Sequence, residues 1–326
     1  MEQCIKQSAM AANQDSMAGV KRVVVDAERA GQRLDNFLLG QLKGAPRSLI
    51  YRLLRTGQVR VNGKRAKPDS RLEGGEEVRI PPLRLAEGGV PDTPSKSLLE
   101  RIEASVIFED RSLIALNKPS GIASHGGSGI SFGAIELLRA ARPKQPLELV
   151  HRLDRDTSGV LVLAKKRSAL TELQRLIREG ALEKRYLCLL VGRLPRQQQT
   201  VDAPLEKSLL QGGERMVKVT AAGKPSVTHF KLIEPAGPHS YGEARIETGR
   251  THQIRVHAQY IGHPLAGDDK YGDRAANLAL KGVGLKRLFL HAASLRFALQ
   301  DGQTPYVFNA PLPEELRAVL DRLQGG

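Results

Sequence analysis

The chain has 326 residues, of which 40% are hydrophobic and 26% charged, a balance typical of soluble globular proteins and long enough for two domains. Its 50 Lys and Arg against 35 Asp and Glu give a formal net charge of +15, which favours a nucleic acid as partner; the alternative is a protein that is merely basic. With two cysteines, no apolar leader and no uninterrupted apolar run of about 18 residues, the sequence excludes a disulfide framework, a cysteine-based zinc site and a membrane span, so we expect a cytoplasmic protein.

The first part of the chain predicts a tail and a small compact domain. Residues 1–20 are polar and poor in apolar side chains, and we expect them to be a disordered tail. Residues 21–82 contain an amphipathic helix over 45–57, with a proline near its start and a glycine at its end. Strand-like residues over 58–67, interrupted by Asn62-Gly63, predict a hairpin.

Charge within this small domain has a single sign. Between residues 43 and 67 there are eight Lys and Arg side chains and no Asp or Glu; we call them the basic patch: Lys43, Arg47, Arg52, Arg55, Arg60, Lys64, Arg65 and Lys67. A solvated helix face normally mixes both signs, whereas a one-sign surface fits phosphate contacts. We therefore expect the patch from Arg47 onward to bind RNA or DNA without reading its sequence.

A second, larger domain is expected after a linker. Residues 83–104 are rich in Gly, Pro, Ser and Glu and predict a linker, and residues 105–326 predict the larger domain. Its strand candidates are 105–110, 112–118, 160–165, 185–192, 228–234, 242–247 and 288–297, and its helix candidates are 133–141, 168–180, 252–262 and 313–323. This order is strand-rich α+β and not a regular βαβ alternation.

The stretch HRLDRDTSG, residues 151–159, places acidic and basic side chains densely before a short apolar strand. Asp154 and Asp156 are the two carboxylates. A turn carboxylate that binds nearby backbone N–H groups would explain either of them, and on this stretch alone a turn is the better explanation than a site. A hydrolase with these two as its carboxylate pair is disfavoured, because a spacing of two in a strand-like loop points them to opposite sides.

The stretch ETGRTHQIRVHAQYIGHP, residues 247–264, predicts a helix for which Thr251 is the expected cap. Its three histidines, His252, His257 and His263, lack the spacing and the carboxylate of a zinc site, so we expect no metal. An arginine of this helix could pair with a carboxylate from elsewhere and keep it ionised.

Two further stretches contain an isolated tyrosine and a group of glycines. Tyr186 opens an apolar strand, where a core tyrosine with its hydroxyl at the rim is the commoner case. LNKPSGIASHGGSG, residues 116–129, is rich in glycine but matches neither a P-loop nor a dinucleotide fingerprint, so a nucleotide cofactor is not expected.

Taken together, HRLDRDTSGVLVLAK, EKRYLCLLVG, GRTHQIRVH and LNKPSGIASHGG resemble the motifs of the A-type family of large-ribosomal-subunit pseudouridine synthases and keep that family's motif order. The small basic domain resembles an S4 (αL-type) RNA-binding domain. The resemblance runs from about residue 25 to the end. It implies a mixed, mainly antiparallel sheet in the second domain, isomerisation of uridine to pseudouridine in 23S ribosomal RNA, and no cofactor or metal.

The resemblance also implies roles for four residues. Asp154 matches the essential carboxylate, and Arg152 the residue that takes the place of the flipped nucleotide. Tyr186 matches the tyrosine packed on the base, and Arg255 the arginine paired with the aspartate. Asp156 lies where the family varies, so we expect it to support the site without reacting.

Several alternatives stay open at this point. A non-catalytic ribosome-assembly factor would need the basic patch alone, and a pseudouridine synthase could act on tRNA instead of ribosomal RNA. Asp154 could attack the ribose, attack uracil C6 or abstract a ribose proton. We expect a monomer, without a membrane partner, and the sequence does not say which uridines are modified.

Overall fold

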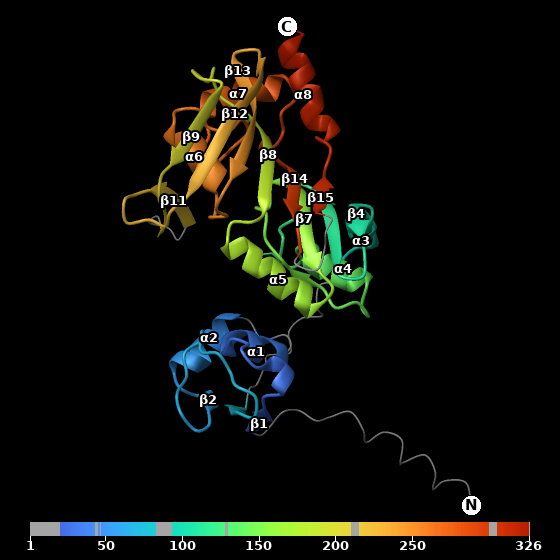
Figure 1. Ribbon diagram of the computed structural model, residues 1–326, viewed down its shortest axis with the longest axis vertical. Coiled ribbons are helices and arrows are strands. Elements are labelled where there is room, and N and C mark those ends of the chain that lie inside the picture. Colours follow the sequence, from blue (N-terminus) through green and yellow to red (C-terminus); the bar gives the residue numbers. More distant parts are fainter. Residues whose placement is uncertain are drawn as a thin grey trace, which may run out of the picture. The chain divides into compact units, whose positions relative to one another are not determined.

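The computed structural model describes residues 20–42, 45, 47–82, 93–127, 130–209, 215–299 and 305–325. The chain divides into two compact units, Met1–Thr93 and Pro94–Gly326 (Figure 1). Apart from Val20, the expected tail lies outside the described residues. Within the described ranges, none of the helices has the length and apolar character needed to cross a bilayer.

Unit 1 combines two helices with a small antiparallel sheet, whose strand order is β1-β3-β2. Its elements are β1 (Lys21–Val24), the short 3₁₀ helix η1 (Ala27–Arg29), α1 (Leu34–Gln41), α2 (Arg47–Arg55), β2 (Arg60–Val61) and β3 (Glu77–Ile80). Leu34 and Leu38 of α1 pack with Ile50 of α2 and with Val78 and Ile80 of β3 in one apolar core.

Helix α2 confirms the helix predicted over 45–57, and its end follows from one glycine. Gly57 has φ +71°, a backbone conformation that costs little without a Cβ. In that conformation the Gly57 N–H donates to Leu54 O at 3.1 Å and the Gln58 N–H to Leu53 O at 2.9 Å. These two bonds satisfy the last carbonyls of the helix and terminate it.

The hairpin predicted over 58–67 is only partly correct. Asn62 and Gly63 have φ values of 48° and 76°, as a type I′ turn requires, and Val61 bridges to Lys64. The chain after the turn does not continue as a strand. β2 pairs instead with the distant β3, which buries Val61 in the core of unit 1.

The expectation of a linker over 83–104 is wrong for its second half. Residues 83–92 lie outside the described residues, but α3 (Lys96–Glu103) is a helix of unit 2. The Ser95 side chain caps it by accepting from the Leu98 N–H at 3.3 Å, and Ile102 is fully buried in the main core. The polar composition of this segment suggested a linker, but residues 96–103 form an amphipathic helix that packs on unit 2.

Unit 2 contains the remaining elements. Its helices are α3, α4 (Ala134–Ala141), α5 (Arg167–Arg178), α6 (Gln253–Tyr260), α7 (Arg274–Gly282) and α8 (Glu314–Gln324). Its strands are β4 (Val106–Glu109), β5 (Leu113–Lys118), β6 (Glu148–Leu149), β7 (Ser158–Ala164), β8 (Glu183–Leu190), β9 (Gln198–Asp202), β10 (Leu205–Leu209), β11 (Arg215–Val219), β12 (Val227–Ala236), β13 (His239–Ile246), β14 (Leu290–Phe297) and β15 (Tyr306–Asn309).

Most of these strands form one 10-stranded mixed sheet in the order β4-β5-β7-β14-β8-β13-β12-β9, with β15 beside β14 and β6 beside β7. Every pairing in it is antiparallel except that of β7 with β14. β10 and β11 form a separate two-stranded hairpin. The expected α+β class with a mixed, mainly antiparallel sheet is confirmed.

Strand β7 is buried on both faces, which explains its continuous apolar sequence. Leu161 and Leu163 face the core that α3 and α4 cover, and Val160 and Val162 face the core that α5 covers. In Figure 1, α5 and α4 lie at the end of unit 2 opposite the C-terminal helix α8. A rigid central strand therefore follows directly after the HRLDRDT stretch.

Candidate active site

The stretch from His151 to Thr157 is a loop that joins β6 to β7. The Thr157 N–H donates to Asp154 O at 3.2 Å, which closes a tight turn. Ser124 supports the loop from behind: its hydroxyl accepts from the Leu153 N–H and donates to Leu153 O, both at 2.8 Å. Asp154 thus projects from a backbone that is fixed on both sides.

A buried lysine supports the same loop. Lys118, at the end of β5, is fully buried, and its ammonium donates to the carbonyls of Pro119 (2.9 Å), Ile122 (2.6 Å) and Arg155 (3.2 Å). Burial lowers the pKa of Lys118 to about 7, against the attraction of Asp156 and Asp154. Three carbonyl acceptors match the three N–H groups of the charged form. The LNKPSG motif therefore stabilises the loop.

Glycine is required where the loop enters β7. Gly159 has φ +110°, and a Cβ there would collide with the backbone of Ala292 in β14. This close approach belongs to the parallel pairing of β7 with β14. The final Ser-Gly of the motif therefore permits the strand contact that holds the loop beside β14.

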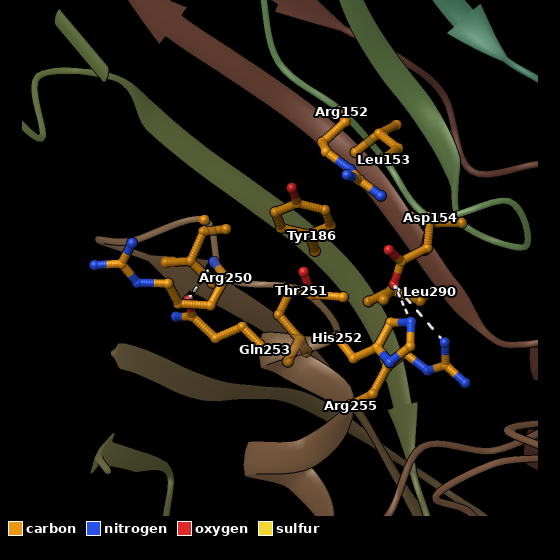
Figure 2. A pocket seen from close by; sticks show the side chains of 14 residues that line it. Arg152, Leu153, Asp154, Tyr186, Arg250, Thr251, His252, Gln253, Arg255 and Leu290 are labelled. Atoms are coloured by element: carbon orange, nitrogen blue, oxygen red, sulfur yellow. Dashed lines mark hydrogen bonds and ion pairs between the residues drawn. The ribbon is translucent and has the colours of Figure 1, made fainter. Parts of the chain in front are cut away.

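Asp154 lies at the wall of a pocket whose other walls come from β8, β14 and the segment before and within α6 (Figure 2). The pocket brings together all four residues singled out from the sequence and several that follow Gly249; its polar and charged lining side chains are Arg152, Asp154, Thr157, Tyr186, Arg250, Thr251, His252, Gln253 and Arg255. Residues from positions 152 to 255 thus meet at one site.

Tyr186 forms an aromatic wall of the pocket. It is 8% exposed and lies on β8 opposite Ala244 of β13 and Ala292 of β14, whose small side chains leave room around the ring. Burial, and to a smaller extent the Asp154 carboxylate, raises the pKa of the phenol, so the hydroxyl stays protonated at neutral pH. It can serve as a proton donor.

Arg255 in α6 connects two carboxylates. Its Nε and Nη2 donate to Asp268 Oδ2 and Oδ1, both at 2.7 Å, and its Nη1 lies 3.7 Å from Asp154 Oδ2. Burial lowers the pKa of this guanidinium, but the bonds to Asp268 and the charges of both carboxylates outweigh it and raise the pKa overall. The expected pairing of Arg255 with Asp154 therefore exists as a looser contact beside a tighter one.

Asp268 is the residue that sequence reasoning missed. Its side chain is 1% exposed, and besides Arg255 it accepts from the N–H groups of Lys270 and Tyr271 at 2.9 and 3.0 Å. Burial acts to raise its pKa, but these bonds and the Arg255 charge lower it. Bonds to backbone N–H groups two and three residues ahead are what any turn aspartate makes, so the sequence held no signal of its tie to Arg255.

Arg152 and Asp156 lie at the more open side. Arg152 is exposed at the edge of the pocket, where its side chain can contact a bound molecule. The Asp156 carboxylate accepts from Arg155 Nε at 3.2 Å, with 45% of its side chain exposed. Beside the pocket lies a larger cavity of about 660 Å³, and its charged lining residues include Lys270, Lys286 and Arg287.

The histidines of the α6 region have separate roles. The ring of His257 bonds to Thr228 Oγ1 and Ala203 O, and that of His263 to Val191 O. The residue that precedes the first turn of α6 is His252, whose backbone is in the left-handed conformation. The expectation of Thr251 as the cap is therefore wrong. Among the described residues no group of three His, Cys, Asp or Glu could hold a metal ion.

The basic patch lies in unit 1. Its members Arg52, Arg55, Arg60, Lys64, Arg65 and Lys67 are exposed; Lys43 and the side chain of Arg47 lie outside what the structure describes. Arg52, Arg55 and Lys67 share a groove of about 470 Å³ with Tyr51. Three of the expected RNA contacts are therefore neighbours around one groove, two of them on α2 and Lys67 on the segment after β2.

Comparison with known proteins agrees with this geometry. Family models match residues 112–260 as an RNA pseudouridylate synthase and residues 32–78 as an S4 domain. The chain is 52% identical to "Ribosomal large subunit pseudouridine synthase C" of Salmonella typhi and of Escherichia coli (strain K12), in each case over 94% of this chain and 97% of the relative.

A solved structure agrees as well. That of human RNA pseudouridylate synthase domain containing 4 superimposes with a TM-score of 0.58 at 25% identity, covering 70% of this chain and 96% of that one. Sequence, site geometry and fold lead to the same result: this chain belongs to the RNA pseudouridylate synthase family and carries an S4 domain at its N-terminal side.

Proposed function

We propose that the chain isomerises uridines of large-subunit ribosomal RNA to pseudouridine, with Asp154 as the essential carboxylate. The observation that carries the proposal is the placement of Asp154 beside Arg255 in a pocket walled by Tyr186. The relatives that are 52% identical over nearly the whole chain are named for the same reaction and the same ribosomal subunit.

The reaction is balanced without an oxidant, reductant or added group. The bond between uracil N1 and ribose C1′ breaks and a bond between C5 and C1′ forms, while C5 loses a proton and N1 gains one. The protein must therefore detach and turn the base, hold the charge that develops and move a proton. Side chains suffice for each of these tasks, so the proposal needs no cofactor.

The target base must first leave the RNA. Stacking inside a helix hides C1′ and C6 of the uridine, and everting one nucleotide costs a few kcal/mol. Arg152 is exposed at the edge of the pocket, where its guanidinium can stack in the vacated position and offset part of that cost. The everted uracil can then pack on the ring of Tyr186.

Asp154 must be anionic in each of the ways in which it could act. A neighbouring cation favours the charged form of a carboxylate. Arg255 supplies that charge at 3.7 Å and is itself held in place by Asp268. Because Arg255 is buried, its charge is screened less by salt than a surface charge would be. Tyr186, protonated, can give or relay a proton near the base.

Ribosomal RNA as the substrate accounts for the charge of the chain. A net charge of +15 and the exposed members of the basic patch fit a structured polyanion. Such contacts position RNA but do not read sequence, so the choice of uridine is left to the catalytic unit. The S4 unit is then an anchor for structured RNA.

The test is to incubate purified protein with unmodified large-subunit RNA and to map pseudouridine at nucleotide resolution. The wild-type chain should convert particular uridines, and Asp154→Asn should bind the RNA with unchanged affinity yet convert none. Appreciable turnover by Asp154→Asn would refute the role of this carboxylate.

Two arms separate the alternatives. If uridines of transfer RNA are converted and those of ribosomal RNA are not, the proposed activity is correct but the proposed substrate is wrong. Full complementation of a deletion strain by Asp154→Asn would instead support a non-catalytic assembly factor, for which the basic patch alone would be enough.

A further inference from the structure

His252 has a backbone conformation that histidine rarely adopts. With φ 53° and ψ 20° it is left-handed, and the other non-glycine residue with positive φ among the described residues is the turn residue Asn62. Such a conformation is strained for a residue with a Cβ and persists where its surroundings hold it. The side chain makes no cap bond to α6, so helix capping does not explain it.

The conformation directs the imidazole into the pocket between two partners. Nδ1 lies 2.8 Å from the hydroxyl of Tyr271, and Nε2 lies 3.8 Å from Asp154 Oδ2. The rings of His252 and Tyr271 meet edge to face with centroids 5.4 Å apart. Tyr271 is 2% exposed and carries the Arg255 guanidinium over its ring at 5.1 Å.

The hydrogen bonds favour one placement of the ring proton. The Val217 N–H of β11 donates to the Tyr271 hydroxyl oxygen at 3.0 Å, and His252 Nδ1 is an acceptor within reach of the hydroxyl's own proton. Nδ1 is then an acceptor, and the proton of the neutral ring is on Nε2, directed at Asp154.

The charges around the ring agree with a neutral imidazole. Burial lowers the pKa of His252 below its ordinary value of 6.5; Arg255 and Lys270 lower it further, while Asp154 and Asp268 oppose them. At neutral pH the side chain is therefore a neutral N–H donor. It can orient the Asp154 carboxylate without neutralising it.

Two donors thus converge on one oxygen of Asp154. His252 Nε2 and Arg255 Nη1 both face Oδ2, at 3.8 and 3.7 Å, while the other oxygen points to the side of Tyr186 (Figure 2). Contacts of this length tighten when a base fills the pocket and displaces water. The oxygen Oδ1 is then left to meet the substrate.

We propose that His252 is a positioning residue: in the Nε2–H form imposed by Tyr271, it fixes Asp154 so that Oδ1 is the reacting oxygen. This inference rests on the proposed function. It also makes the β10–β11 hairpin part of the device, because the Val217 N–H of β11 is what directs the Tyr271 hydroxyl proton to His252.

Two variants isolate the Nε2–H group. In His252→Asn the amide tolerates the left-handed backbone and reaches only the Nδ1 position, so it keeps the contact to Tyr271 but loses the donor to Asp154. In His252→Gln the amide N–H reaches the Nε2 position. The measurements are the single-turnover rate constant of pseudouridine formation in the RNA that the wild type modifies, the RNA dissociation constant and the melting temperature.

We expect His252→Asn to lower the rate constant by about tenfold to a hundredfold, as for an angstrom-scale misplacement of a reacting group. RNA affinity and melting temperature should stay near those of the wild type, and His252→Gln should recover most of the rate. A wild-type rate in His252→Asn, or a rate in His252→Gln as low as in His252→Asn, would overturn the inference.

Tyr271→Phe supplies a readout that a purely structural role of His252 would not move. Removing the hydroxyl takes away a bond to the neutral ring, which raises the pKa of His252. The acid limb of the pH–rate profile should then move to higher pH in Tyr271→Phe. In the double variant Tyr271→Phe/His252→Gln it should stay at its wild-type position. An unmoved limb in Tyr271→Phe contradicts the proposal. If the wild-type chain forms no pseudouridine in any RNA, the proposed function fails first.

Discussion

Asp154 and Asp268 share one guanidinium unequally. Arg255 makes two bonds of 2.7 Å to Asp268, whose side chain is 1% exposed, and one contact of 3.7 Å to Asp154, whose side chain is 23% exposed. Asp268 thus fixes the position of the guanidinium, and Asp154 stays able to move against a substrate. A single strong pair between Arg255 and Asp154 would hold the proposed reactive carboxylate too tightly to change partner.

Asp268→Asn tests this division. Removing one charge of a buried pair costs about 3 kcal/mol in the free energy of unfolding, and the rate of isomerisation should fall because Arg255 loses its anchor. Asp269→Asn, at the exposed neighbouring position, is the matched control and should change neither. Chemical denaturation and single-turnover assays of the three proteins make the comparison; equal stabilities would contradict it.

The loss of stability in Asp268→Asn should depend on pH in one direction. The pKa of Asp268 is lowered in the folded chain from a value of 3.8, so its contribution to stability is fully present above pH 3.8 and is lost as pH falls through the lower, folded value. The stability difference between wild type and Asp268→Asn should therefore be constant near neutrality and shrink in acid below pH 3.8. A difference that grows in acid would exclude this assignment.

Lys118→Met tests the support behind the loop that carries Asp154. Methionine keeps much of the volume but removes three donors, which leaves the carbonyls of Pro119 and Ile122 unsatisfied, whereas Arg155 O keeps the bond from the Gly121 N–H at 2.9 Å. We expect a loss of about 2–3 kcal/mol in the free energy of unfolding and a lower rate of isomerisation at saturating RNA. Lys166→Met, at an exposed position after β7, is the control; a rate in Lys118→Met equal to that of the control would refute the supporting role.

At the level of residues, the sequence predicted those that carry a motif. Arg152, Asp154, Tyr186 and Arg255 belong to motifs far apart in the chain, and the fold brings them to one pocket. Asp268 was not predicted, because its local hydrogen bonds are those of an ordinary turn. Contacts that only tertiary packing creates leave no periodic trace in the sequence.

At the level of elements, apolar periodicity predicted those helices that bury a wide apolar face against their own unit. α2, α4, α5 and α8 were predicted from their amphipathic spacing. α3 was missed because its surroundings have a linker's composition, although Ile102 is fully buried. α7 was missed because Leu280 is its only residue that is buried, so the apolar stripe is too narrow to recognise.

Helix α2 offers a paired test of its terminator. Gly57→Ala places a Cβ at φ +71° and should reduce the stability of the helix end by about 1 kcal/mol. Gly40→Ala, inside α1 with open space around its Cβ, should have the opposite sign, because alanine is favoured over glycine within a helix. Hydrogen exchange of the α2 amides should accelerate in Gly57→Ala and not in Gly40→Ala. The same sign in both variants would mean that Gly57 is not the terminator.

At the level of the whole molecule, the two units divide the work of recognition. Unit 1 carries the basic patch, and unit 2 carries the pocket that we propose takes one base. The boundary between Thr93 and Pro94 lies within the segment expected to be a linker, but the catalytic unit begins earlier than predicted because α3 belongs to it. The composition of residues 83–104 indicated roughly where the two units divide. The packing of α3 on unit 2 places the boundary at the start of that helix.

The division predicts how RNA binding responds to salt. Each phosphate contact that is lost reduces the slope of log K against log salt by about 0.7–0.9, so replacing Lys64, Arg65 and Lys67 with Gln should reduce it by about 2–3 and weaken binding to all RNA sequences alike. The control replaces three exposed lysines outside the patch, Lys96, Lys231 and Lys281, with Gln, which lowers the net charge equally.

In that control the slope should change little, because counterions are released at contacts and not by net charge. Filter binding from about 50 to 200 mM salt measures both variants, over the range in which such contacts weaken affinity most visibly. Equal slopes in the two triple variants would mean that the basic patch does not touch phosphate. The S4 unit would then bind RNA through a different surface.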